Sequence, residues 1–222
     1  MKASEFVEKA KGLLKLNTSY LMGGFGCRLG KDWYDKTYAW NKDNAELIES
    51  RTDTDPITFG FDCVCMLKSL WWGFDGNTSK PYGSAVYASN GVADMSIASL
   101  KKTCPELLND FNNIEEGEIV FLGNNHCGVY IGNGEVIEST PAWKCCVQKT
   151  LLPWRNSTNY DKLPVRAWDF HGKTNLLEYP AANSWRDMYA KLSAKYTELD
   201  EENRNLKESL KKVKQIVGEI NV

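Results

Sequence analysis

The segment from Glu116 to Thr140 constrains the fold of this chain most strongly, because it reads as a series of paired strands. In "EGEIVFLGNNHCGVYIGNGEVIEST" apolar residues recur with a period of two, which is typical of half-buried strands. The pattern predicts a strand before the "GNN" turn, a second strand over 127–131 and a third over 135–139. The last two flank Gly-Asn-Gly at 132–134, and an Asn-Gly turn between alternating apolar residues is a strong hairpin signal.

The rest of the first 179 residues favours helices before this segment and further strands after it. The expected elements are helices over 3–16, 42–50, 63–72 and part of 92–104, with later strands over 145–151 and 164–170. Ser4 is the expected N-cap of the first helix. Helices first and antiparallel strands second indicate one α+β domain over residues 1–179.

The chain changes character after a short linker at 180–184. Residues 185–222 contain no Pro and one Gly, and their apolar residues repeat every seven positions. One row of this repeat is Trp185, Leu192, Leu199, Leu206, Val213 and Ile220, and the companion row is Tyr189, Tyr196, Asn203, Leu210 and Val217. Such a repeat predicts a coiled-coil helix that joins copies of the chain in parallel. The alternative is a long helix folded back on its own domain.

Composition excludes several classes of protein. The formal net charge is −2, which argues against a nucleic-acid partner. Neither an apolar run of about 20 residues nor a secretory signal is visible, so no membrane span is expected. The seven cysteines are expected to be reduced, and no Cys-x-x-Cys pair or surplus of histidines indicates a zinc site. We therefore expect no metal and no cofactor.

The "FDCVC" sequence places a thiol at a helix start. Cys63 lies in the first turn, where unpaired backbone N–H groups and the helix dipole favour thiolate over thiol. Cys65 lies roughly 200° further round the helix and points elsewhere. A reactive cysteine is therefore expected at Cys63, although both residues could simply be core cysteines.

A base for this thiol must come from His126 or His171, the two histidines of the chain. His126 begins a strand of the predicted hairpin, and the return strand carries Glu138. Tyr130 and Glu135 are near neighbours across the turn, so His126 and Glu138 are expected within cross-strand or diagonal reach. His171, flanked by aromatic residues, is expected to close the fold instead.

Three segments of the sequence together resemble a known family. "YLMGG", "FDC" and the "EGEIVF…HCGVYIGNGEVIEST" segment are similar to the NlpC-type cysteine peptidases, which have a papain-like core. The resemblance covers Phe6 to Tyr179, and "RAWDFHGKTNLLEY" resembles the closing strand of such domains in bacteriophage endolysins. It implies a Cys–His–polar triad that cleaves peptide or amide bonds in bacterial peptidoglycan.

The resemblance also implies roles for individual residues. Cys63 would be the nucleophile, His126 the general base and then acid, and Glu138 the residue that orients the histidine. Tyr20 and Asp62 are the expected oxyanion- and substrate-binding residues of the family motif, and an exposed Trp143 could stack on sugar or peptide. The sequence departs from the family at Val64-Cys65, where Ser-Gly is usual, at Glu138, where His is frequent, and in the extra segment 21–61.

We therefore expect a phage-lysin-like peptidoglycan hydrolase, made in the cytoplasm of a bacterial host and acting on the wall after release. An acyltransferase or peptidase with the same triad and another substrate is an alternative. A non-catalytic virion, structural or binding protein is a further alternative.

Overall fold

The structure is a computed structural model that describes residues 1–30, 40–155, 162–180 and 185–220. Residue contacts divide the chain into two compact units, Met1–Tyr179 and Pro180–Val222. Of the expected linker at 180–184, only Pro180 lies within the described residues.

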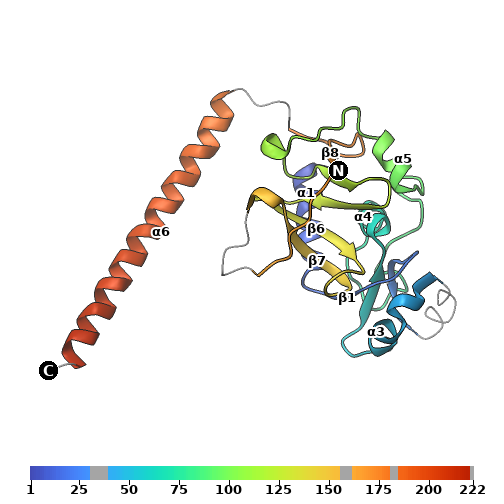
Figure 1. Cartoon of the computed structure of the whole chain (residues 1–222), viewed down its shortest axis with the longest axis horizontal. Coiled ribbons are helices and arrows are strands. Elements are labelled where there is room, and N and C mark those ends of the chain that lie inside the picture. Colours follow the sequence, from blue (N-terminus) through green and yellow to red (C-terminus); the bar gives the residue numbers. More distant parts are fainter. Residues whose placement is uncertain (31–39, 156–161, 181–184, 221–222) are drawn as a thin grey trace. The chain divides into compact units, whose positions relative to one another are not determined.

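The first unit combines short helices and short strands (Figure 1). Its helices are α1 (Ala3–Leu13), α3 (Ala45–Ser50), α4 (Cys63–Trp71) and α5 (Ile97–Lys102), with 3-10 turns η1 (Lys42–Asn44), η2 (Phe111–Asn113) and η3 (Pro153–Arg155). Its strands are β1 (Asn17–Tyr20), β2 (Phe25–Arg28), β3 (Thr58–Phe61), β4 (Ile119–Leu122), β5 (His126–Tyr130), β6 (Glu135–Thr140), β7 (Cys146–Leu151) and β8 (Phe170–Gly172). The α+β class predicted from the sequence is therefore confirmed.

Five of the strands form an antiparallel sheet in the order β7-β6-β5-β4-β8. The predicted hairpin is present as β5 and β6. Its register is Tyr130 opposite Val136, one residue further along than the expected neighbours Tyr130 and Glu135. The Ile131 N–H donates to the Glu135 carbonyl, so Ile131 lies opposite Glu135 and the turn spans 132–134.

A second sheet of three strands precedes α4 and was not expected. Its order is β1-β3-β2, with β1 parallel and β2 antiparallel to β3. Each strand has four residues, and all four residues of β3 are buried, so the sequence offers no alternation of apolar and polar positions there. The middle strand β3 leads within one residue into α4.

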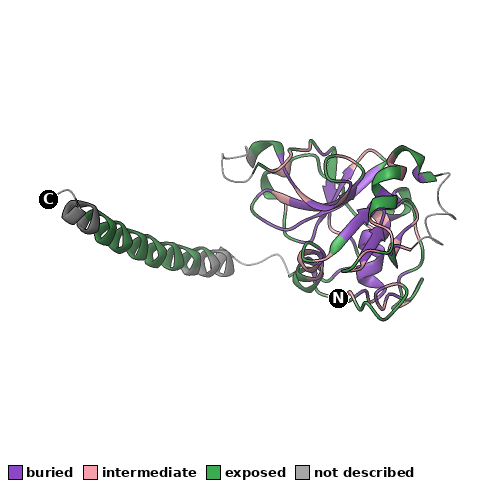
Figure 2. Ribbon diagram, turned by 90° about the horizontal axis from the view of Figure 1, so that it is seen from below, coloured by how far each residue is buried: buried purple, intermediate pink, exposed green. Residues whose placement is uncertain are grey.

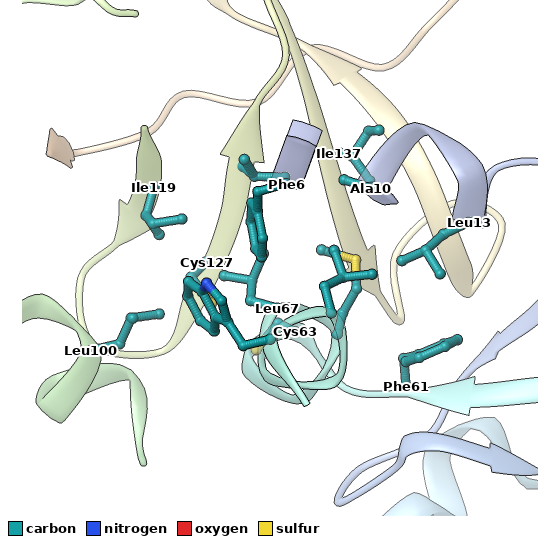
Figure 3. Packing of buried hydrophobic residues seen from close by; sticks show 14 of the residues in the cluster. Phe6, Ala10, Leu13, Phe61, Cys63, Leu67, Leu100, Ile119, Cys127 and Ile137 are labelled. Carbon is teal, nitrogen blue, oxygen red and sulfur yellow. The ribbon is translucent and has the colours of Figure 1, made fainter. Parts of the chain in front are cut away.

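The core lies between α1, α4 and the five-stranded sheet (Figure 3). Phe6 of α1 stacks on Trp71 of α4, with ring centroids 4.8 Å apart. Leu67 of α4 and Ile137 of β6 are fully buried in the same cluster. Each such side chain contributes roughly 1.5–3 kcal/mol through burial, so α4 is held firmly against the strands that follow it.

The N-cap of the first helix lies two residues before the expected one. Lys2 takes the N-cap position without a side-chain hydrogen bond, and the expectation for Ser4 is wrong. The Ala3 N–H instead donates to the Glu178 carbonyl at 3.0 Å, so a backbone group from the end of the unit takes the place of a capping side chain. The helix was expected to run to residue 16 but ends at Leu13, and Leu14, the residue that follows, is exposed.

The described residues of the second unit form one helix, α6 (Trp185–Ile220). The described side chains of its predicted seam are exposed, as the colouring of Figure 2 shows: Leu192, Tyr196, Leu199, Asn203, Leu206, Leu210 and Val213. No helix within the described ranges, α6 included, has both the length and the apolar character that crossing a membrane requires.

Candidate active site

Cys63 is the first residue of α4, as its place in the sequence predicted. Asp62 caps the helix: its Oδ1 accepts the Cys65 N–H at 2.6 Å, and its Oδ2 accepts the Gly23 N–H at 2.9 Å. Both carboxylate oxygens are thus occupied by backbone donors, and Asp62 fixes the turn between β3 and the helix. The backbone N–H of Cys63 itself lies at the positive end of α4.

His126 and Glu138 face each other across β5 and β6. The Nε2 atom of His126 lies 2.5 Å from Oε2 of Glu138, and both residues are buried. Gly128 makes this approach possible, because a Cβ atom there would lie 3.3 Å from the Glu138 Cβ and 2.9 Å from the Ile137 carbonyl oxygen. With Nε2 engaged, Nδ1 is the ring nitrogen left for the thiol of Cys63, whose interaction with His126 raises the pKa of the imidazole.

The other carboxylate oxygen of Glu138, Oε1, accepts hydrogen bonds from two residues that were not predicted from the sequence. Thr150 Oγ1 donates to Glu138 Oε1 at 2.7 Å, and Arg166 Nε donates to the same atom at 2.8 Å. Thr150 belongs to β7, which neighbours β6. Because side chains along a strand alternate between the two faces of a sheet, Thr150 lies on the same face as Glu138. Arg166 lies in an irregular segment, and no pattern in the sequence links it to the hairpin.

Two tryptophans complete the surroundings of the histidine. Trp168 stacks on His126 with ring centroids 5.5 Å apart and an angle of 10° between the rings. Trp143 follows β6, has a φ angle of 56°, and is 53% exposed. Its ring lies 4.6 Å from the guanidinium carbon of Arg166, so the expected stacking residue is joined to the carboxylate through this arginine.

The electrostatics favour a charged pair of Cys63 and His126. A hydrogen bond with the neighbouring thiol of Cys127 and the contact with His126 outweigh burial and lower the pKa of Cys63 to about 5. Burial opposes protonation of His126, but its hydrogen bonds with Cys63 and Glu138 raise its pKa to about 9. Between these values the sulfur is a thiolate and the imidazole is protonated. The contribution of Cys127 to the lowered pKa of Cys63 was not predicted from the sequence.

The remaining cysteines have the opposite tendency. All seven are free. Burial raises the pKa of Cys27 to about 12 and that of Cys104 to about 11, and it also raises the pKa of Cys65, Cys145 and Cys146. Among the seven thiols, Cys63 is therefore the one whose pKa is lowered.

Tyr20 lies at the end of β1, close to the helix start. Burial, followed by the nearby Cys63 and Asp62, raises the pKa of Tyr20 above its usual range, so its hydroxyl stays protonated and can donate. The backbone N–H of Tyr20 donates to the Cys145 carbonyl at 2.9 Å, which ties β1 to the segment that carries Trp143.

His171 lies on β8 and belongs to a separate pair. Its Nδ1 contacts Glu118 Oε2, and its Nε2 lies 3.0 Å from the Asp110 carbonyl oxygen. Both members of the pair are buried. A hollow of about 900 Å³ lies elsewhere, between β1 and β7, and none of Cys63, His126 and Glu138 lines it.

No protein-family model and no curated protein matches the sequence. Similar solved structures include RipB, a peptidoglycan hydrolase from Mycobacterium tuberculosis, with 18% identity and a TM-score of 0.43 over 80% of this chain and 66% of that chain. They also include the P60 domain of an antigen from M. avium subspecies paratuberculosis, with 20% identity and a TM-score of 0.40 over 80% of this chain and 96% of that domain. The chain thus spans just under two thirds of the RipB chain.

Proposed function

We propose that the first unit is a cysteine hydrolase that cleaves an amide or peptide bond of bacterial peptidoglycan. The observation that carries the proposal is a thiol at the start of α4 beside an imidazole whose other nitrogen is held by a buried carboxylate. This is the arrangement that activates a cysteine nucleophile.

The chemistry follows from the positions of these groups. The Cys63 thiolate attacks the carbonyl carbon of the scissile bond, and the carbonyl oxygen takes up the negative charge. The Cys63 backbone N–H at the helix start is placed to stabilise that charge, with the Tyr20 hydroxyl as a second donor. His126 then gives its proton to the leaving amine, and a thioester remains on the sulfur.

Water completes the cycle. Neutral His126 takes a proton from the water molecule as its oxygen attacks the thioester carbonyl. The carbon–sulfur bond breaks, a carboxylic acid leaves, and Cys63 returns as a thiolate beside protonated His126. Glu138 keeps the imidazole ring in one orientation through both halves of the cycle.

The choice of peptidoglycan as substrate rests on the motif resemblance to NlpC-type peptidases, because thioester chemistry by itself does not select an acceptor. We extend the same proposal to a phage-lysin role, in which the protein is made in a bacterial host and reaches the wall after release. Within this class the scissile bond is the amide between sugar and stem peptide, or a peptide bond in the stem or cross-bridge.

A decisive experiment compares wild type with Cys63→Ala on purified Gram-positive cell walls. We expect wild type to reduce the turbidity of the suspension and Cys63→Ala to leave it unchanged. Cys65→Ala is the matched control, since it removes a buried thiol two residues away on the same helix and should keep activity. Equal turbidity loss with all three proteins would reject the cysteine mechanism, and mass spectrometry of released fragments would identify the bond.

We also propose that α6 joins copies of this chain in a parallel coiled coil. Its leucine-rich seam is exposed in the single chain, which leaves apolar surface that a second copy would cover. In the parallel register, Lys195 faces Asp200 of the next copy and Glu202 faces Lys207, so opposite charges flank the seam. Several catalytic units on one assembly would bind a polymeric substrate with higher avidity.

A further inference from the structure

Arg166 is a largely buried cation beside Glu138. Its side chain is 15% exposed, and it touches the one carboxylate that holds the proposed base. Besides the bond from Nε to Glu138, its Nη2 donates to Thr140 Oγ1 at 3.2 Å. Its own backbone N–H donates to the Leu151 carbonyl at 3.0 Å, which fixes the arginine at the end of β7.

Glu138 needs a permanent positive partner because its carboxylate is completely buried. Burial alone raises the pKa of a carboxyl group, since the charged form loses its hydration. Here that effect is outweighed by hydrogen bonds and charge from His126 and then from Arg166, and the pKa of Glu138 is lowered.

The two positive partners differ in one respect that matters during turnover. His126 loses its proton each time it protonates a leaving group, and at that moment it no longer balances the charge of Glu138. The guanidinium of Arg166 stays protonated throughout. We propose, building on the hydrolase function above, that Arg166 is a positioning residue that keeps Glu138 ionised and in place when His126 is neutral.

The aromatic contacts of Arg166 extend this role to the rim of the site. The guanidinium carbon lies 4.6 Å from the ring centroid of Trp143 and 5.5 Å from that of Trp168. Trp168 in turn stacks on His126. One planar cation therefore supports both the ring that packs on the base and the exposed ring at the surface.

The test measures how fast iodoacetamide alkylates Cys63 between pH 4 and pH 9, with the modified peptide quantified by mass spectrometry. In wild type the rate rises as the thiolate forms. In Arg166→Gln the loss of a positive charge raises the pKa of Glu138 and of Cys63, so we expect the midpoint of this rise to move up by about one pH unit or more. Arg166→Lys keeps the charge and should keep the midpoint within a few tenths of a pH unit.

Lys149→Gln is the matched control for the removal of a positive charge. Lys149 lies on β7 next to Thr150 and pairs with Glu135 at 3.1 Å, so its side chain occupies the other face of the sheet from Glu138. Its replacement should leave the midpoint unchanged. Circular dichroism at the assay temperature verifies that each variant is folded.

An unchanged midpoint in folded Arg166→Gln would overturn the inference, as would an equal shift in the Lys and Gln variants. If Arg166→Gln does not fold, Arg166→Lys carries the test, because a shifted midpoint in that variant contradicts the role of the charge. The alkylation assay uses no wall substrate. Failure of wild type to degrade cell walls would reject the hydrolase function without deciding this result.

Discussion

His126 and Glu138 meet diagonally across two adjacent strands, with the Nε2 and Oε2 atoms 2.5 Å apart. The contact is possible because Gly128, which lies beside Glu138 on the facing strand, carries no side chain. The orientation of the His126 ring is therefore determined by a pair of strands rather than by a loop. If His126 acts as the base of the proposed mechanism, it loses little entropy on reaching its working position.

Replacement of Glu138 by Gln should lower kcat/KM for wall fragments by about 10²- to 10³-fold, because the amide no longer stabilises the imidazolium form of His126. Glu135→Gln is the matched control, since Glu135 lies on the same strand but pairs with Lys149 on the other face. Kinetics on a soluble wall fragment would measure both. A Glu138→Gln enzyme with wild-type kcat/KM would remove Glu138 from the mechanism.

The pH profile should be bell-shaped. Activity should rise as the pH passes the Cys63 pKa of about 5, because the thiolate forms, and fall near the His126 pKa of about 9, because the imidazolium loses the proton that the leaving amine needs. At pH 6, carboxymethylation followed by mass spectrometry should label Cys63 well before the other cysteines. Uniform labelling in native protein would contradict the ion pair.

His171→Gln should destabilise the first unit by about 3–5 kcal/mol, because it leaves Glu118 buried without its charged partner. Chemical denaturation monitored by fluorescence would measure the loss. The native pKa of His171 is raised: burial opposes protonation, but the hydrogen bond with Glu118 prevails. Its stabilisation is therefore complete below the ordinary histidine pKa of about 6.5 and declines as pH rises through the native value.

This pH dependence supplies the check for the same variant. The gap in unfolding free energy between wild type and His171→Gln should be widest at about pH 5.5 and narrower at alkaline pH. A gap that does not change with pH would show that His171 contributes by packing against Phe111 rather than by charge. Cys63 alkylation in the folded variant should match wild type, because the pair is separate from His126.

Trp143→Ala should raise KM for wall fragments about 2- to 10-fold with little change in kcat, because an exposed ring at the rim adds stacking to ground state and transition state alike. Trp143→Phe should recover part of this binding. Steady-state kinetics would separate the two parameters. An unchanged KM in Trp143→Ala would place the substrate away from this ring.

Truncation after Tyr179 should give a monomer whose Cys63 alkylation profile matches that of the full chain, since the first unit has its own core. Light scattering would compare the masses of the two proteins. Leu199→Glu and Leu206→Glu in the full chain should also yield monomers, because each buries a charge in the seam. An unchanged mass after truncation would count against self-association through α6.

The long periodic segments were the predictable part of this fold. The Gly-Asn-Gly turn predicted the β5–β6 hairpin, and the helix expected over 3–16 is present as α1 (Ala3–Leu13). The sheet β1-β3-β2 was missed because its strands are short and β3 is buried on both faces, which removes the alternation on which a strand prediction depends.

The residues of the candidate site also differ in whether the sequence could predict them. Cys63, His126 and Glu138 could be proposed because each follows a local signal, a helix start or a hairpin. Arg166 and Cys127 could not, because their contacts depend on how distant segments pack in three dimensions. Arg166 follows Glu138 by 28 residues, and nothing in its sequence neighbourhood indicates a carboxylate partner.

Cys63, His126 and Glu138 all lie on one helix and one hairpin, and this arrangement can be used in protein engineering. α4, β5 and β6 are anchored by the core, whereas Trp143 lies on the connection between β6 and β7. Libraries that randomise this connection can therefore search for new substrate preferences while the reactive groups keep their positions. Under the proposed function, the same separation would let natural selection change the substrate without moving Cys63, His126 and Glu138.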